Sequence, residues 1–329
     1  MEYGLHFGTR RVAGTPEGIR EVSTHCENLG FRHFGLSDHI VIPKTIDSRY
    51  EYHESGNHPT TGSGFCLDLL TTLTFVAAVT NRIRLLTSVM VLPYRPALLT
   101  AKMLATADIL SKGRITAGVG VGWMEEEMIA LQTPSFKNRG KVSDEFIAAF
   151  RDLWYSADPR SETENVKFKN LFFEPRPIQT PLPIWIGGEG PAARKRAGRI
   201  GDGWYPVAKT FSIDLDTPSL LKEGIQEVRN HAENSDRNPD TLEMALYVPW
   251  YKVGEPRKRK DGSRLRFTGS TEDIIQDVCE FEEVGLQHLV IGFETEIIAD
   301  AKERISQFSE QIAGKITSIR SGIACYEAL

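Results

Sequence analysis

Cysteine is scarce in this sequence, and its placement excludes two kinds of site. Only four of the 329 residues are cysteines, Cys26, Cys66, Cys279 and Cys325. They lie far apart, and no pair has the C-x-x-C spacing of a zinc site or a dithiol redox motif. We therefore expect reduced thiols, as in a cytoplasmic protein, rather than a framework of disulfides.

Long apolar runs and a strong charge of one sign are absent as well. No run approaches the roughly 20 apolar residues of a membrane span, and MEYGLHFGTRR lacks the apolar segment of a signal peptide. The 39 basic and 44 acidic residues give a net charge of −5, which argues against nucleic acid or an anionic membrane as the main partner. We expect a soluble, cytoplasmic protein that acts on a small molecule.

Two further kinds of catalytic pattern are missing. The chain has no H-x-H, no H-E-x-x-H and no carboxylate cluster, and its first strand pattern offers only His6, so we expect no metal site. The nucleophile elbow G-x-S-x-G is also absent.

The sequence does contain a regular alternation of short apolar strands and helical patterns. The first helical pattern, 16–29, has Thr15 as its N-cap, Pro16 at its first position and Gly30 as its stop. Apolar strands of this length are typical of a parallel sheet buried on both faces. We expect eight strands at residues 3–7, 33–37, 84–92, 115–121, 183–186, 203–205, 242–253 and 288–291.

Eight such units in a chain of this length predict an α/β fold of one domain, residues 1–329, built as a closed (β/α)₈ TIM barrel. Three segments interrupt the alternation and are interpreted as insertions. They follow strand two (43–64), precede strand five (157–181, with a small hairpin) and follow strand seven (256–266). The first two are expected to shape the substrate pocket, because loops carry the variation of such folds.

In such barrels the chemistry lies at the C-terminal ends of the strands. Strand two ends at Asp38 and His39, and a histidine there can exchange protons near neutral pH. A structural histidine is the alternative. Strand five ends in glycines that let backbone N–H groups approach an anion, and the following helix adds its positive dipole end. Arg194, one turn into that helix, could reach the same anion. The alternative is an ordinary turn that needs glycine for packing.

The run GVGVG in strand four, residues 118–122, does not match the dinucleotide fingerprint G-x-G-x-x-G. Counted from Gly118, the last glycine of that pattern would fall on Trp123. Alternating glycines instead clear one face of a strand. Inside a barrel this makes space for a flat ligand, or it serves tight packing of the barrel itself.

Two longer segments resemble the luciferase-like flavin monooxygenase superfamily, and within it the coenzyme F420-dependent oxidoreductases. They are RIRLLTSVMVLPYRPALLTAKMLATADILSKGRITAGVGVGWMEEE and PIWIGGEGPAARKRAGRIGDGW, and the SDH at 37–39 fits the same pattern. The similarity extends from about Leu5 to Pro206 and fades in the C-terminal third.

The resemblance implies a (β/α)₈ barrel that binds coenzyme F420, or alternatively FMN, at the strand ends. It implies a non-prolyl cis peptide at Ser88–Val89 against one face of the ring, and His39 as the residue that assists hydride transfer. The other residues implied in cofactor binding are Asp38, Gly122, Trp123, Glu126, Gly187, Gly188, Glu189, Gly190, Pro191 and Arg194, of which those from Gly187 to Pro191 would hold the cofactor phosphate.

The sequence departs from the family pattern in two places. Some family dehydrogenases have an acidic residue at the end of strand four where this chain has Trp123, which argues against a sugar-phosphate substrate. The loop PRKRKDGSRLR, 256–266, is unusually basic. It could attract an anionic substrate or the oligoglutamate tail of F420, or it is simply a solvated charged segment.

Four functions therefore stand side by side. The first is an oxidoreductase that moves a hydride between F420 and a small organic substrate. The second is a two-component monooxygenase that uses reduced FMN from a separate reductase. The third is a flavin-binding barrel without activity, and the fourth a phosphosugar isomerase, for which the strand ends offer only one convincing acid or base, His39. A homodimer and a flavin or F420 reductase are the expected protein partners.

Overall fold

Eight strand positions form a closed parallel barrel in the computed structural model, which describes residues 1–52, 55–57 and 63–318. The strands are β1 (Glu2–Phe7), β2 (His33–Leu36), β3 (Arg84–Thr87) with its continuation β4 (Met90–Val91), β5 (Ile115–Gly120), β8 (Ile184–Gly187), β9 (Gly203–Tyr205), β10 (Glu243–Val248) and β13 (His288–Gly292). Their order is β3-β2-β1-β13-β10-β9-β8-β5-β4, and pairing of β3 with β5 closes the ring. The expected barrel is confirmed.

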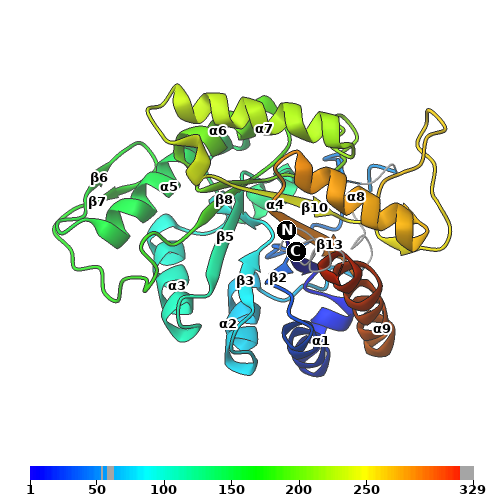
Figure 1. Ribbon diagram of the computed structural model, residues 1–329. Coiled ribbons are helices and arrows are strands. Elements are labelled where there is room, and N and C mark those ends of the chain that lie inside the picture. The colour runs from blue at the N-terminus through cyan, green and yellow to red at the C-terminus, as the bar shows by residue number, and fades with distance from the viewer. Residues whose placement is uncertain (53–54, 58–62, 319–329) are drawn as a thin grey trace, which may run out of the picture.

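Helices surround the strands, as Figure 1 shows. The ring consists of α1 (Pro16–Asn28), α2 (Leu69–Val79), α3 (Ala97–Leu110), α5 (Arg139–Tyr155), α6 (Pro191–Ile200), α7 (Pro218–Glu233), α8 (Thr271–Glu283) and α9 (Ile298–Phe308). Local signals begin several of them: the Thr15 side chain accepts from the N–H of Gly18, and Ser270 and Asp273 form a capping box at α8. Within the described ranges no helix is both long enough and apolar enough to cross a membrane.

Two expected strands are shorter in the structure than the sequence patterns indicated. Strand three is divided into β3 and β4 by the cis peptide bond Ser88–Val89, which the resemblance implied. Strand seven ends at Val248, because Pro249 follows and a proline cannot donate to the ladder. Lys252–Val253 (β11) pairs instead with Thr268–Gly269 (β12).

The insertions lie outside the barrel wall. The one before β8 carries the expected hairpin, with β6 (Ser161–Glu162) antiparallel to β7 (Lys167–Phe168) at the periphery of Figure 1. The loop that follows β2 is described except at 53–54 and 58–62, so His53 and His58 lie outside the described residues, as does Cys325.

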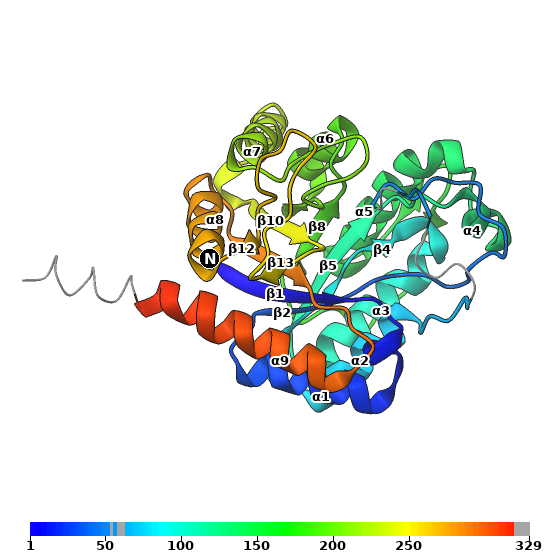
Figure 2. The same ribbon diagram turned by 90° about the vertical axis from the view of Figure 1, so that its right-hand side faces the viewer.

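Apolar side chains fill the barrel and separate its two ends. Leu86, Trp185, Tyr205, Ala245 and Val290 form a buried cluster contributed by five strands. A larger apolar core packs the outer face of the strands against the helices. Figure 2 shows the strands from the side, with the N-terminus at one end and α4 (Glu125–Ala130) at the other, where the strands end. We call the α4 end the mouth.

Glycines surround the Ser88–Val89 segment at the closure of the barrel. A Cβ on Gly118 would lie 2.1 Å from the carbonyl oxygen of Thr87, and one on Gly120 would lie 2.9 Å from Val89. Gly187 of β8 would meet Val89 at 2.9 Å as well. The alternating glycines of β5 thus serve tight packing against the β3–β4 junction, the second of the two interpretations left open by the sequence.

This crowding predicts that Gly118→Ala strongly destabilises the protein. A methyl group at 2.1 Å from a backbone oxygen forces the backbone of β3 or β5 to move, and such overpacking costs about 1–3 kcal/mol or more. Urea unfolding should show the loss. The matched control is Gly190→Ala, whose new Cβ would have its nearest neighbour at 3.8 Å and which should change stability by less than about 0.5 kcal/mol. Equal stability of the two variants would contradict this account of the closure.

Candidate active site at the barrel mouth

The residues that the sequence singled out follow the C-terminal ends of neighbouring strands, and these strand ends form the mouth in Figure 2. Asp38 and His39 follow β2, Ser88 and Val89 lie between β3 and β4, Trp123 follows β5, and the glycine loop follows β8. The strands place them there because all of these strands run parallel, so their carboxyl ends share one rim.

His39 is held by a buried carboxylate. Its Nδ1 lies 2.6 Å from Oε2 of Glu127, a fully buried residue of α4. The same carboxylate accepts from the hydroxyl of Tyr94 at 2.8 Å and from the backbone N–H groups of Ile40 and Val41 at 2.7 and 3.1 Å. A carboxylate in this position fixes the imidazole as the Nδ1–H tautomer and leaves proton exchange to Nε2.

Glu127 is the residue that the sequence analysis missed. It is one of three consecutive glutamates, and the sequence pattern pointed to its neighbour Glu126. Glu126 instead accepts from the N–H groups of Asp47 and Ser48, both at 2.8 Å, and thereby anchors the loop that follows β2. A short helix that begins at the mouth gives no apolar repeat from which the inward glutamate could be identified.

Asp38 has partners different from those of its neighbour His39. Its carboxylate forms a bidentate ion pair with Arg95, with both N–O distances 2.9 Å, and also accepts from the N–H of Val91 at 2.9 Å. Arg95 continues to Asp68 at 2.7 Å. Asp38 thus holds β4 and the segment before α3, and the implied contact with the cofactor ring or its side chain stays a prediction.

Aromatic side chains cross the mouth from β5 to β8. The ring of Trp123 lies 6.4 Å from that of His39 and 5.0 Å from that of Tyr50, and Tyr50 lies 5.3 Å from Tyr52. The charge of Glu189, followed by burial, raises the pKa of Tyr52. The described residues 47–52 of this loop therefore lie across the mouth, where the carbonyl oxygen of Glu51 accepts from the N–H of Phe211 at 2.7 Å. We call this segment the lid.

The glycine loop has the geometry of an anion site. Gly188 has a φ of +108°, which favours glycine, and a Cβ there would lie 3.0 Å from Ala193. Gly190 is the N-cap of α6, and its carbonyl oxygen accepts from the N–H groups of Ala193 and Arg194 at 3.0 and 3.1 Å. Pro191, the first residue of the helix, has no N–H, so what the helix offers an anion here is mainly the positive end of its dipole. Arg194 donates from one terminal nitrogen, Nη1, to Glu227 of α7 at 2.6 Å, and its contact with an anion stays a prediction.

Glu189 lies buried in this loop, with 7% of its surface exposed. Its Oε1 accepts from the N–H of Val207 at 2.8 Å. Burial raises the pKa of this carboxyl from 4.5 to about 7, against the lowering effect of the Val207 hydrogen bond. Glu189 thus changes charge in the neutral range at the place where an anion would bind.

Beneath the mouth, polar side chains fix the β3–β4 junction. Nε2 of His6 lies 3.2 Å from the carbonyl oxygen of Ser88, and the hydroxyl of Ser88 lies 2.8 Å from that of Tyr205. The ring of Tyr247 packs on His6 at 4.4 Å. Burial lowers the pKa of His6 to about 4, so this imidazole is neutral at pH 7 and donates to Ser88.

The basic loop after β10 is folded back onto the protein. Arg259 pairs with the buried Asp216, and Arg264 and Arg266 both pair with the buried Asp277. Arg257, Lys258 and Lys260 are exposed. Three of the arginines that could have attracted an anion are thus engaged in ion pairs, an arrangement that neither sequence interpretation included.

The raised pKa of Glu189 predicts a specific pH dependence of stability. Its carboxyl group binds a proton more tightly in the folded chain, so its contribution to stability is complete below about pH 4.5 and is lost as the pH rises through about 7. Glu189→Gln cannot lose that proton. As the pH rises from 5 to 8, the free energy of unfolding of the variant should increase relative to that of the parent, by up to about 3 kcal/mol. The exposed Glu223→Gln should show no such trend, and parallel curves for Glu189→Gln and the parent would refute the assignment.

Comparison with known proteins identifies the family of this chain. The family model for luciferase-like monooxygenases matches residues 3–259. An uncharacterized protein of Mycobacterium tuberculosis is 32% identical over 234 residues, which cover 68% of this chain and 78% of that protein. An F420-dependent glucose-6-phosphate dehydrogenase of Amycolatopsis mediterranei is 31% identical over 245 residues, which cover 70% of this chain and 65% of that enzyme.

Solved structures share the fold across nearly the whole chain. An F420-dependent secondary alcohol dehydrogenase, in complex with an F420-acetone adduct, superposes with a TM-score of 0.74 at 19% identity and covers 95% of this chain and 98% of its own. A monooxygenase from Streptomyces bottropensis gives 0.74 at 20% identity, with 96% and 99% covered. At these identities the likeness shows the fold alone. The match over residues 3–259 shows more: the chain belongs to the luciferase-like monooxygenase family, a family of enzymes whose members include F420-dependent oxidoreductases.

Proposed function

We propose that this protein is an F420-dependent oxidoreductase that transfers a hydride between the deazaflavin and a small organic substrate bound at the mouth. The observation that carries the proposal is the contact between His39 and Glu127, 2.6 Å long, at the end of β2. It supplies a positioned proton donor or acceptor beside the place where the family binds its cofactor, and the relatives named above include F420-dependent dehydrogenases.

The residues present fit a phosphorylated tricyclic cofactor. The N-terminus of α6 suits the phosphate, and the positive φ of Gly188 brings the loop after β8 to that helix end. Val89 and Trp123 offer apolar surface for the ring, and Gly122 keeps the chain close there with a φ of +85°. When bound, F420 supplies or accepts the hydride at its C5. Gly187, Glu189, Gly190 and Pro191 complete the proposed phosphate loop.

His39 would move the proton that accompanies the hydride. With Nδ1–H donated to Glu127, the lone pair of Nε2 can accept a proton from a substrate hydroxyl, and the imidazolium formed is stabilised by the adjacent carboxylate. In the reverse direction the protonated ring donates. The lid with Tyr50 and Tyr52 would exclude water from this step.

Two other residues implied by the resemblance act more indirectly in this proposal. Asp38 fixes the backbone of β4 through Val91 and the start of α3 through Arg95. Glu126 anchors the lid at Asp47 and Ser48. Arg194 would reach a phosphate only by leaving Glu227.

The alternative is a monooxygenase that uses reduced FMN, and it is favoured by the similar fold of the Streptomyces bottropensis enzyme. A phosphosugar isomerase would need a second acid or base near His39. A cytoplasmic location, a homodimer and a reductase partner belong to the proposal as well.

The proposal predicts that the purified apoprotein binds F420 more tightly than FMN. Fluorescence titration of both cofactors, oxidised and reduced, measures the difference. A clear preference for reduced FMN together with oxygen-dependent turnover would establish the monooxygenase instead. Gly188→Asp serves as the site control, because it adds a Cβ and a negative charge to the phosphate loop, and it should weaken binding more than tenfold, or by more than about 1.4 kcal/mol.

The second prediction concerns His39 and Glu127. His39→Ala should lower kcat by about 10²–10⁴, the usual contribution of a positioned acid or base, and leave the Kd of the cofactor nearly unchanged. Glu127→Gln should lower kcat less and shift the pH profile of kcat, because the amide no longer stabilises the imidazolium. Asp38→Asn is the comparison: it should lower the free energy of unfolding rather than the rate at saturating cofactor. Loss of cofactor binding in His39→Ala, with an unchanged rate at saturation, would make His39 a binding residue.

A further inference from the structure

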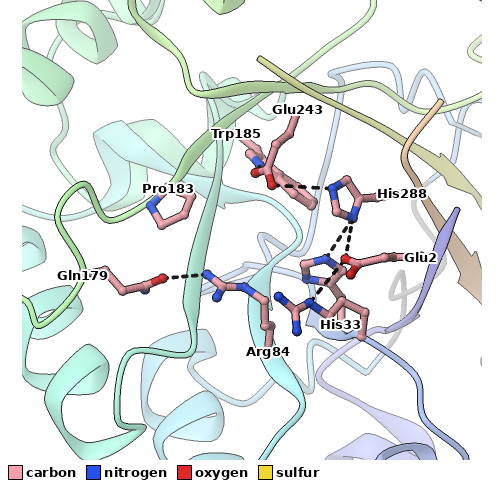
Figure 3. A pocket seen from close by; sticks show the side chains of 9 residues that line it. Glu2, His33, Arg84, Gln179, Pro183, Trp185, Glu243 and His288 are labelled. Carbon is pink, nitrogen blue, oxygen red and sulfur yellow. Dashed lines mark hydrogen bonds and ion pairs between the residues drawn. The ribbon is translucent and has the colours of Figure 1, made fainter. Parts of the chain in front are cut away.

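The end of the barrel opposite to the mouth holds a cluster of histidines and glutamates that the proposed function does not use. Glu2, His33, Glu243 and His288 are the first residues of β1, β2, β10 and β13. The strands are parallel and adjacent, with Glu2 paired with His288 and Gly4 paired with His33, so their first side chains gather at this end (Figure 3).

Three of these side chains already have the spacing of metal ligands. Nε2 of His33 lies 3.3 Å from Nδ1 of His288, and Nδ1 of His288 lies 3.3 Å from Oε2 of Glu2. The ligand atoms of all three residues lie within 4.8 Å of one another. Two ligands bound to zinc at 2.0–2.1 Å with tetrahedral geometry are about 3.4 Å apart. The cluster therefore needs little rearrangement to accept an ion.

The surroundings of His288 match those of a metal-bound histidine. Its other ring nitrogen, Nε2, lies 3.6 Å from Oε1 of Glu243, and Oε2 of Glu243 accepts from the indole N–H of Trp185 at 2.7 Å. A carboxylate that holds the second nitrogen of a histidine ligand orients the ring and strengthens the metal bond. Trp185 in turn keeps Glu243 in place.

The ring of His33 is buried and only partly hydrogen-bonded. It is 99% buried, yet its Nδ1 has no hydrogen-bond partner among the described residues, and its Nε2 faces only the nitrogen of another imidazole. Buried polar groups are normally satisfied, so such a ring calls for an explanation. Both histidines line a cavity of about 110 Å³, which also contains Arg32 and Arg84.

We propose that Glu2, His33 and His288 bind one Zn²⁺ ion at this end of the barrel, with the fourth position open to water in the cavity. Two imidazoles and one carboxylate are a ligand set that zinc uses. The ion would connect β1 with both of its neighbours, near the start of the chain and near its end. Its role is to stabilise the barrel, because the apolar layer around Trp185 and Val290 separates it from the mouth.

Arg32 is the competitor for this site. Its Nε lies 3.2 Å from Oε2 of Glu2, the oxygen that the ion would use. About half of the Arg32 side chain is exposed, so it can leave for solvent. Removal of Arg32 should therefore increase the affinity for zinc, a gain that a misfolded variant would not produce.

Calorimetric titration of tag-free, chelator-treated full-length protein with ZnCl₂ tests the proposal. We expect one ion per chain and a rise in Tm on its addition, which mass action requires for a ligand of the folded state. His33→Ala and His288→Ala should each weaken binding by about a hundredfold or more. Glu2→Gln, at a half-exposed position, covers the case in which a histidine variant does not fold. His231→Ala, a partly exposed histidine of α7, is the matched control and should bind as the parent does.

Arg32→Gln completes the experiment and should bind zinc several-fold more tightly than the parent. Unchanged affinity in Glu2→Gln and His288→Ala, or weaker binding in Arg32→Gln, would overturn the proposal. Stabilisation by inorganic phosphate without any response to zinc would assign the cavity to an anion at Arg32 and Arg84. F420 titration of the same variants separates the two proposals, since none of these residues lies at the mouth.

Discussion

The closure of the barrel rests on the close approach of β5 to the Ser88–Val89 segment. Glycines at 118, 120 and 187 allow it, because any larger residue would place a Cβ within 2.1 to 2.9 Å of that segment. The position of the mouth follows from this contact. His6 and Tyr205 bind the two sides of Ser88, and Asp38 binds the N–H of Val91. A packing constraint between backbones thus sets the floor on which the polar groups of the mouth are arranged.

Much of the fold was predictable because its signals are local. The strands and helices follow from short apolar runs, caps such as Thr15 and stops such as Gly30, and all eight strand positions lie where the pattern placed them. The errors occurred in two strands: β3 is interrupted at Ser88–Val89, and β10 ends before Pro249. The interruption of β3 depends on glycines of other strands, which periodicity cannot reveal. The end of β10 could have been read from Pro249, because a proline cannot donate to the ladder.

The position of the candidate site could be predicted from the sequence, but the side-chain partners of its residues could be predicted only in part. The rule that chemistry lies at strand ends identified His39 and the glycine loop. It did not identify Glu127, 88 positions away from His39, nor the pairing of Arg194 with Glu227. Side-chain partners of this kind depend on which face of a helix turns inward. The cluster at the opposite end was missed for the same reason: His33 and His288 are 255 positions apart, and spacing rules for metal sites search only short intervals.

The carboxylate of Glu127 shows why a histidine suits this mouth. It is fully buried and is satisfied by the hydroxyl of Tyr94, two backbone N–H groups and the ring of His39. None of those four donors carries a permanent charge. When Nε2 of His39 takes up a proton, the ring becomes positively charged. It is then the one cation among the four groups that donate to Glu127. In a buried environment such a pair is stronger than in water. The structure therefore holds the ring of His39 against a buried carboxylate at the strand ends, which is what the proposed hydride transfer requires of a proton acceptor.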